Sequence, residues 1–338
     1  MKTHLKIAAI GGGTGLSILL RGLKQVTDNV TAIVSVGDDG GGSGILREDL
    51  GMLPPGDIRA CILALANTEP LMEDLIQYRF KEGQLSGQNF GNLMLAAMVG
   101  ISDNFEDAIQ KFSDIFAITG RVLPVTTSEM ILKAKLSDGS WVTGESKIPR
   151  IAQRRGARIE ELLLEGDQPS ALEDAILAIL NADIVVLGPG SLYTSVIPNL
   201  LVDGVREALQ VTEAKRIYVP NIMTQPGETD GYTVKDHVHE LMKHSAMGIV
   251  DFVFANTTVL DLQTARNYAA EKSYPVELTQ MDRQWLSDNH IGVIEGSFCE
   301  VYKGYVRHDA AKMADHMVTL IDTKVYRNKR YMTPLDQT

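Results

Sequence analysis

The sequence has little cysteine and no long apolar segment. Its 338 residues include two cysteines, Cys61 and Cys299, which lie far apart and form no Cys-x-x-Cys pair. This argues against a disulfide framework and a metal–thiolate site, and it is typical of a reducing compartment. No apolar run approaches the length that spans a bilayer, and the N-terminus enters a strand pattern without a signal peptide. We therefore expect a cytoplasmic protein with no membrane span.

An excess of basic residues is also missing. Lys and Arg number 32 against 43 Asp and Glu, a formal net charge of −11. A diffuse acidic surface argues against nucleic acid as the main partner, although it leaves room for a local basic pocket around a phosphate. No internal repeat is present. The length and the alternating strand and helix patterns predict one α/β domain over 1–325, with an insert at about 121–170 and a polar tail over 326–338.

Two familiar nucleotide-binding motifs are absent. The dinucleotide fingerprint needs glycines at its first, third and sixth positions, but counting from Gly11 or Gly13 the sixth position is Leu16 or Ile18. The Gly-Lys-Ser/Thr ending of a Walker A loop is not found here either. The sequence instead has Gly-Gly-Gly-Thr-Gly at 11–15, between an apolar strand pattern and a helical pattern.

This glycine-rich segment predicts a phosphate-binding loop. Glycine adopts positive φ and lets a ligand approach the backbone, and the first N–H groups of a helix attract anions. A strand-to-helix turn without a ligand is the simpler interpretation, but four glycines in five residues cost backbone entropy that a plain turn need not incur. We favour a mononucleotide or sugar-nucleotide site formed by Gly11, Gly12, Gly13, Thr14 and Gly15.

A second segment rich in glycine and hydroxyl residues follows the apolar segment 183–187, which is expected to form a strand. Its sequence is Gly-Pro-Gly-Ser-Leu-Tyr-Thr-Ser at 188–195, and a helix is expected from about Pro198. The hydroxyl groups could merely cap that helix, but we favour a second set of anion donors. The candidate residues are Gly188, Gly190, Ser191, Thr194 and Ser195.

Acidic residues follow the strand expected at 29–36. Asp38 and Asp39 lie in a glycine-rich loop, and Asp57 lies where another helix begins. Ligands bind at this edge of a doubly wound sheet, so Asp38 and Asp39 could accept from a ribose hydroxyl or hold Mg²⁺ between phosphates, or they could form an acidic turn. Asp57 is either an N-cap or a carboxylate facing these two acids, and the sequence favours neither.

Other polar residues lie at predicted element ends. Asn89 and Asn92 begin a helix and could cap it or contact a base or sugar. Asn221 and Thr224 follow another strand and are candidates for the same contacts. Arg307 precedes the last helix and could pair with a phosphate or carboxylate.

The expected insert combines a hairpin with a basic stretch. Strand patterns at 130–136 and 141–144 flank the turn Gly139-Ser140, which predicts a β-hairpin. Lys and Arg residues concentrate at 147–170, which we expect to be a solvated, mobile connection.

Taken in order, six segments resemble the YvcK-type branch of the CofD-like family, the gluconeogenesis factors. The resemblance covers about residues 6–321, and the ordered set is specific although each segment alone is not. It implies an α/β fold, a Rossmann-like, doubly wound, mainly parallel sheet with helices on both faces and a small β-hairpin/helical insert. The segments are Gly-Gly-Gly-Thr-Gly (11–15), Val-Gly-Asp-Asp-Gly-Gly (36–41), Pro-Pro-Gly-Asp-Ile-Arg (54–59), Asn-Phe-Gly-Asn-Leu (89–93), Gly-Pro-Gly-Ser-Leu-Tyr-Thr-Ser (188–195) and Asn-Ile-Met-Thr-Gln-Pro-Gly-Glu-Thr (221–229).

The resemblance also implies functions. CofD enzymes transfer a phospholactyl group from a guanylyl donor to a deazaflavin alcohol with Mg²⁺, and their acids match Asp38 or Asp39 and Asp57. YvcK-type members are associated with cell shape and wall synthesis during gluconeogenic growth and with binding UDP-sugars such as UDP-N-acetylglucosamine. Their sugar-nucleotide arginine, in an Arg-His-Asp run, matches Arg307. A homodimer, a cell-wall-synthesis protein partner and the lack of a tightly bound organic cofactor are also implied.

Three hypotheses follow. The leading one is a UDP-sugar-binding regulatory protein whose two glycine loops hold the diphosphate. The alternative is a transferase of a phosphorus-containing group, in which Asp38, Asp39 and Asp57 bind Mg²⁺ or one of them acts as a base. The third is an NAD-binding oxidoreductase, which the missing sixth-position glycine weakens.

Overall fold

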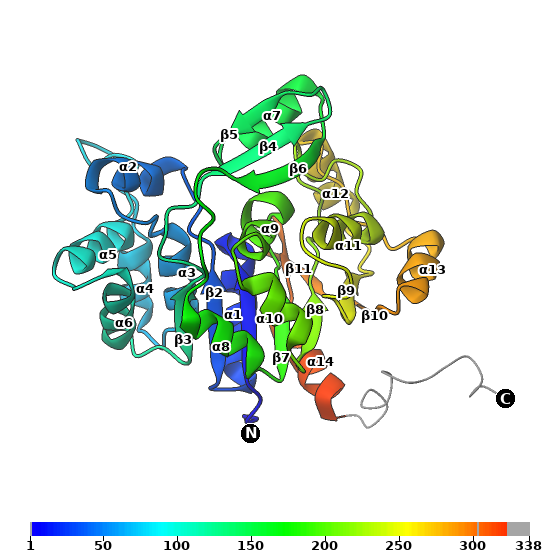
Figure 1. Cartoon of the computed structure of the whole chain (residues 1–338), viewed down its shortest axis with the longest axis horizontal. Helices are drawn as coiled ribbons and strands as arrows, with labels where there is room; N and C mark the ends of the chain where they lie inside the picture. Colours follow the sequence, from blue (N-terminus) through cyan, green and yellow to red (C-terminus); the bar gives the residue numbers. More distant parts are fainter. Residues whose placement is uncertain (1, 303, 323–338) are drawn as a thin grey trace.

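A parallel sheet forms the centre of the protein (Figure 1), in a computed structural model that describes residues 2–302 and 304–322. The sheet has seven strands in the order β10-β9-β8-β7-β1-β2-β3, and all neighbours are parallel. The α/β fold and the mainly parallel sheet are therefore confirmed. The strands are β1 (Ile7–Gly11), β2 (Val30–Val34), β3 (Arg121–Pro124), β7 (Ile184–Leu187), β8 (Lys215–Tyr218), β9 (Phe252–Asn256) and β10 (Gly292–Gly296).

The strand order reverses next to β1. The chain runs from β1 to β2 and β3 on one side, and later returns with β7 on the other side of β1, with Ile10 opposite Leu187. In doubly wound sheets ligands bind at such a reversal, outside the carboxyl ends of the strands. We therefore expect a ligand site in the crevice outside the carboxyl ends of β1 and β7.

Both faces of the sheet are covered, which explains why its strands are apolar throughout rather than alternating. Ala8 and Ile10 of β1 belong to one buried cluster, together with residues of α8, α10 and α11. Ile7 and Ala9 point to the other cluster, which residues of α1, α3 and α14 complete. Helices therefore lie on both faces, as predicted.

The helices connect these strands. They are α1 (Gly13–Val26), α2 (Gly41–Leu50), α3 (Gly56–Leu65), α4 (Pro70–Gln77), α5 (Phe90–Gly100), α6 (Phe105–Ile115), α7 (Ile148–Arg155), α8 (Glu173–Leu180), the π-helix η1 (Leu192–Val196), α9 (Ile197–Leu200), α10 (Val205–Val211), α11 (Val234–Lys243), α12 (Leu262–Ala270), α13 (Gln280–Asp288) and α14 (Ala310–Asp322). None of the helices in the described part of the chain has the length and apolarity needed to cross a membrane.

The insert is a small antiparallel sheet in the order β5-β4-β6, seen above the central sheet in Figure 1. Its strands are β4 (Leu132–Leu136), β5 (Trp141–Thr143) and β6 (Ile159–Leu164), and the hairpin prediction is confirmed. The prediction of a mobile connection at 147–170 is wrong, because this stretch forms α7 and β6. Their residues Ile148 and Leu162 are buried in the same cluster as one face of the central sheet.

A two-stranded hairpin precedes the last helix. It consists of β11 (Cys299–Tyr302) and β12 (Tyr305–His308), so Arg307 and His308 lie on a strand that precedes α14. Asp309 begins that helix, since its carboxylate accepts from the Lys312 N–H at 3.0 Å. The predicted polar tail at 326–338 lies outside the described residues.

Candidate functional site

The first glycine loop joins β1 to α1 directly. Gly13 begins the helix with φ of +68°, which favours glycine. A Cβ atom on Gly15 would lie 2.7 Å from the Pro189 carbonyl oxygen, so glycine is needed for the close approach to the second loop. The N–H groups of Thr14 and Gly15 make no hydrogen bond with the other described residues. They are the free donors expected at a helix N-terminus.

The second loop follows β7 and lies against the first. Its chain turns at Gly188, with φ of +78°, and then enters η1 with Ser191 as the N-cap. The Asn199 side chain ties the two loops together, because Nδ2 donates to the Gly11 carbonyl oxygen at 3.2 Å and to the Ser195 carbonyl oxygen at 2.8 Å. The helix was expected from about Pro198. In the structure it begins earlier, at Leu192, as the π-helix η1.

Both loops line one cavity of about 310 Å³. Gly13 and Ser191, one from each of the loops expected to hold the diphosphate, therefore meet at the same edge of the sheet. The cavity also collects residues from the loop after β8, from α12 and from β12. Its lining is Gly12, Gly13, Thr14, Gly15, Ile18, Gly190, Ser191, Ser195, Asn221, Ile222, Met223, Gln225, Tyr268, Val306, Arg307 and His308.

Arg307 is the one residue of permanent charge in this lining. Its guanidinium lies 5.5 Å from the centre of the Tyr305 ring and makes no hydrogen bond or ion pair with the described residues. The neighbouring His308 is half-buried, and its Nε2 lies 3.1 Å from the Pro220 carbonyl oxygen. Because burial lowers the pKa of His308 to about 4, the imidazole is neutral at pH 7 and donates to that oxygen. The unpaired arginine therefore supplies the positive charge of the cavity.

Three side chains form a hydrogen-bonded chain along the cavity wall. Asn221 Nδ2 donates to Gln225 Oε1 at 2.6 Å, and Gln225 Nε2 donates to Ser191 Oγ at 2.8 Å. Thr224, which is also a predicted site residue, is instead buried, and its hydroxyl accepts from the Tyr274 N–H at 2.9 Å. In the segment after β8, Asn221 therefore lines the cavity, whereas Thr224 stabilises the conformation of the segment.

Asp57 lies behind the first glycine loop. It is the second residue of α3, whose N-cap is Pro55, so the N-cap interpretation is wrong. Its carboxylate accepts from the Gly13 N–H, and a Cβ on Gly12 would lie 2.6 Å from its Oδ2. Burial, and secondarily the charge of Asp38, raises the pKa of Asp57 to about 6. The structure therefore places Asp57 near Asp38, whereas the alternative interpretation expected it to face both Asp38 and Asp39.

Further acids extend from this pair toward the insert. The Asp39 carboxylate accepts from the Ser146 N–H at 2.8 Å. Burial, followed by the charge of Asp38, raises the pKa of Glu145 to about 8. Burial raises the pKa of Glu228 to about 7, and this carboxylate accepts from the Tyr193 N–H at 3.2 Å. Neither glutamate was predicted as a site residue, because neither lies in a sequence pattern that distinguishes a buried acid from a surface acid.

A magnesium site would have to be built from few protein ligands. Within residues 2–302 and 304–322, no group of three or more His, Cys, Asp or Glu side chains is arranged to hold a metal ion. Mg²⁺ is commonly bound by one or two carboxylates plus phosphate oxygens. Asp38 and Asp57 are neighbouring carboxylates, whereas Asp39 is directed toward the insert.

Besides the three acids, six residues predicted to bind the nucleotide or its phosphates lie outside the cavity lining. Asn89 caps α5 by accepting from the Asn92 N–H at 3.1 Å, and Asn92 Oδ1 accepts from Arg59 Nε at 2.7 Å. The Thr194 hydroxyl donates to Glu228 at 3.3 Å, below the second loop. These contacts give the side chains structural partners. The six residues are Gly11, Asn89, Asn92, Gly188, Thr194 and Thr224.

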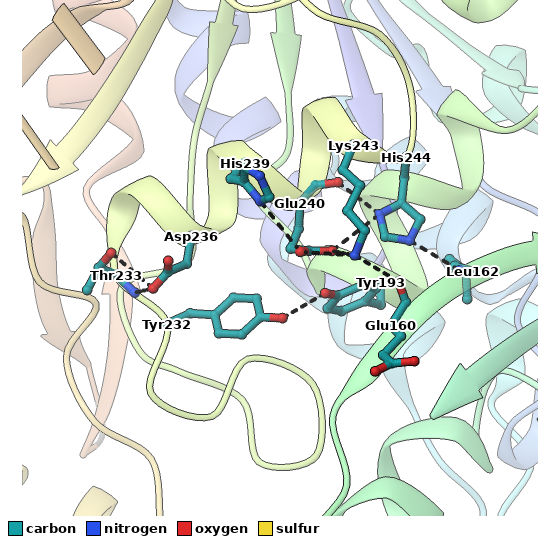
Figure 2. Close-up of polar contacts among 10 residues, drawn as sticks. All are labelled: Glu160, Leu162, Tyr193, Tyr232, Thr233, Asp236, His239, Glu240, Lys243 and His244. Carbon is teal, nitrogen blue, oxygen red and sulfur yellow. Dashed lines mark hydrogen bonds and ion pairs between the residues drawn. The ribbon is translucent and has the colours of Figure 1, made fainter. Parts of the chain in front are cut away.

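A polar network supports the second loop from behind (Figure 2). The hydroxyl of Tyr193, in η1, lies 2.8 Å from the hydroxyl of Tyr232. The neighbouring α11 reaches the insert, because His244 Nε2 accepts from the Leu162 N–H at 3.1 Å and Lys243 Nζ donates to the Glu160 carbonyl oxygen at 2.8 Å. Contacts from η1, α11 and β6 thus meet behind the second loop.

Several other residues of the cavity wall were not predicted from the sequence. Gln225 lies within the 221–229 segment, but its type alone did not mark it. Tyr268 lies on α12, which no pattern predicted, and Val306 and His308 reach the cavity only through the β11–β12 hairpin.

Comparisons with known proteins agree with this architecture. The family model described as 2-phospho-L-lactate transferase CofD matches residues 7–299. A protein of Clostridium acetobutylicum is 52% identical over 326 residues, 96% of this chain and 72% of that protein. The protein of Bacillus subtilis named gluconeogenesis factor is 43% identical over 317 residues, 94% of this chain and 98% of that protein.

A solved structure shares the fold. The crystal structure of a UPF0052 family member from Bacillus halodurans superposes with a TM-score of 0.88 at 42% identity, covering 93% of this chain and 99% of that chain. The family match and the relatives span the central sheet and both glycine loops. This chain belongs to the CofD family and is similar to its gluconeogenesis factors.

Proposed function

We propose that this protein binds a nucleoside diphosphate sugar, with UDP-N-acetylglucosamine as the first candidate. We propose further that it acts as a regulatory protein for cell-wall synthesis and cell shape during gluconeogenic growth. The observation that carries the proposal is the meeting of two glycine–hydroxyl loops and one unpaired arginine in a single cavity. The relatives named gluconeogenesis factor support the physiological part.

The donors of the cavity match a diphosphate. The free N–H groups of Thr14 and Gly15 lie at the N-terminus of α1, where the helix dipole favours an anion. Ser191 and Ser195 add hydroxyl groups from the other side, and Arg307 adds a charge that can bind two oxygens at once. In this proposal the diphosphate lies between the loops.

The side-chain amide of Asn221 suits the base or the sugar of the ligand. Asn221 retains one amide N–H and its Oδ1 after its bond to Gln225. Such a donor–acceptor pair can contact a base edge or a sugar amide. Ile222, Met223 and Tyr268 give apolar surface beside it. A cavity of about 310 Å³ is at the small end for such a ligand, so part of the sugar would extend to the surface.

A Mg²⁺-dependent transferase is the second candidate, and one observation favours it. Asp57 adjoins the first glycine loop with Asp38 near it, and burial raises the pKa of Asp57 to about 6. A carboxyl group of this kind can accept a proton from an attacking hydroxyl. The same pair could instead give two carboxylates to Mg²⁺, which would offset the charge of a leaving phosphate.

Calorimetric titration separates the two functions. UDP-N-acetylglucosamine, GDP and NAD are each titrated with and without Mg²⁺ into the wild type and into Asp57→Asn. We expect UDP-N-acetylglucosamine to bind without metal and to bind Asp57→Asn at least as well. Binding that collapses without Mg²⁺, together with turnover of a nucleotide donor, would favour the transferase. Failure of all three ligands to bind would contradict both functions.

A further inference from the structure

Gln225 lies at the centre of the hydrogen-bonded chain on the cavity wall. Its side-chain oxygen accepts from Asn221 Nδ2 at 2.6 Å, and its side-chain nitrogen donates to Ser191 Oγ at 2.8 Å. All three residues line the cavity. Gln225 therefore joins the loop after β8 to the second glycine loop.

The backbone of Gln225 is fixed by a compact turn. Its N–H donates to Thr229 Oγ1 at 2.8 Å, and its carbonyl oxygen accepts from the N–H groups of Glu228 at 3.0 Å and Thr229 at 2.9 Å. In the structure the side-chain amide of Gln225 turns its oxygen toward Asn221 Nδ2, which can only donate. The Gln225 NH₂ group then faces Ser191 and donates to its Oγ at 2.8 Å.

This orientation determines what the Ser191 hydroxyl can do. A serine hydroxyl has one proton to donate and two lone pairs to accept with. The Gln225 amide uses one lone pair, and Ser191 Oγ has no other hydrogen bond with the described residues. Its proton is left for a group in the cavity. An anionic oxygen there would receive a charge-assisted hydrogen bond, which is stronger than a neutral one.

We propose that Gln225 is a positioning residue that sets Ser191 as a hydrogen-bond donor to the ligand's diphosphate. The inference deepens the proposed function and rests on it. It assigns anion recognition at the second loop to the pair of Gln225 and Ser191, and it leaves the remaining N–H and the Oδ1 of Asn221 to the uncharged part of the ligand.

The variant Gln225→Met tests the proposal, because methionine has a similar length but no amide group. UDP and UDP-N-acetylglucosamine are titrated into each protein by calorimetry. Loss of one positioned hydrogen bond corresponds to about tenfold weaker binding. The matched control is Gln284→Met, on the exposed surface of α13, where glutamine bonds only to its neighbour Asp288 and affinity should not change.

A double-mutant cycle separates positioning from general damage. If Gln225 acts through Ser191, then in the Ser191→Ala background Gln225→Met should weaken binding by less than about twofold. A purely structural effect would remain about tenfold in both backgrounds, and thermal unfolding of each variant would show the accompanying loss of stability. Undiminished loss in the Ser191→Ala background overturns the proposal, and so does wild-type affinity in Gln225→Met.

The outcome for the proposed function is separate. If the wild type binds neither UDP compound, the proposed function fails, and the positioning role fails with it. If the wild type binds and Gln225→Met binds equally well, only the role of Gln225 fails.

Discussion

Replacing Asp57 with asparagine should make the protein more stable at neutral pH. The carboxylate is buried behind the Gly12–Gly13 turn, and burial and Asp38 raise its pKa from 3.8 to about 6. One pKa unit corresponds to about 1.4 kcal/mol, so the ionised form is disfavoured in the folded protein by about 3 kcal/mol relative to the unfolded chain. Asparagine carries no charge, and its Oδ1 can still accept from the Gly13 N–H.

The direction of the pH effect follows from the raised pKa. Below pH 3.8 Asp57 is protonated in both the folded and the unfolded state, and its contribution to the free energy of unfolding is fully present. That contribution is lost as the pH rises through about 6, because the folded protein then has to hold a buried carboxylate. The wild type and Asp57→Asn should therefore have similar stability near pH 4. At pH 7 the variant should gain about 1–3 kcal/mol in the free energy of unfolding.

Urea unfolding followed by circular dichroism, at intervals from pH 4 to pH 8, measures this difference. The exposed Asp74→Asn, on α4, is the matched control and should change the free energy of unfolding by less than about 0.5 kcal/mol. A variant less stable than the wild type at pH 7 would refute the reasoning, as would a difference between wild type and variant that does not change with pH.

Three further substitutions test other parts of the site. Gly15→Ala should lower the free energy of unfolding by about 1–3 kcal/mol in urea titrations, because its Cβ would lie 2.7 Å from the Pro189 carbonyl oxygen; normal stability would contradict this close approach. Arg307→Ala should weaken UDP-N-acetylglucosamine binding by about 10–100-fold in calorimetry, with Arg307→Lys intermediate; unchanged affinity would remove the arginine from the site. Tyr193→Phe should lower the free energy of unfolding by about 1 kcal/mol in thermal unfolding, because the Tyr232 hydroxyl loses its hydrogen-bond partner at 2.8 Å. An unchanged melting temperature would show that this hydrogen bond does not contribute to stability.

Local sequence was enough to predict the two glycine loops. Each loop follows a short apolar strand and ends in a helix, and these signals lie within about ten residues of one another. What the sequence could not state is that β7 lies directly beside β1, because strand order depends on packing between distant segments. The meeting of Gly13 and Ser191 was therefore an inference from the general topology of doubly wound sheets, and the structure supports it.

The missed features depend on contacts that no local pattern reveals. Arg307 does precede the last helix, as predicted, but the hairpin that carries it was not predicted, because it forms only when Cys299–Tyr302 pairs with Tyr305–His308. The basic stretch 147–170 was predicted to be solvated because it is rich in arginine. Apolar residues between the arginines, including Ile148 and Ala152, nevertheless form a buried stripe. Charged residues on the exposed face of a helix do not exclude a buried opposite face.

The central claim is that the two glycine loops hold one diphosphate between them. A crystal structure of the wild type with UDP-N-acetylglucosamine tests it most directly. We expect diphosphate oxygens at about 3 Å from the N–H groups of Thr14 and Gly15 and from Ser191 Oγ. A diphosphate bound away from both loops, or held only through a metal on Asp38 and Asp57, would contradict the account.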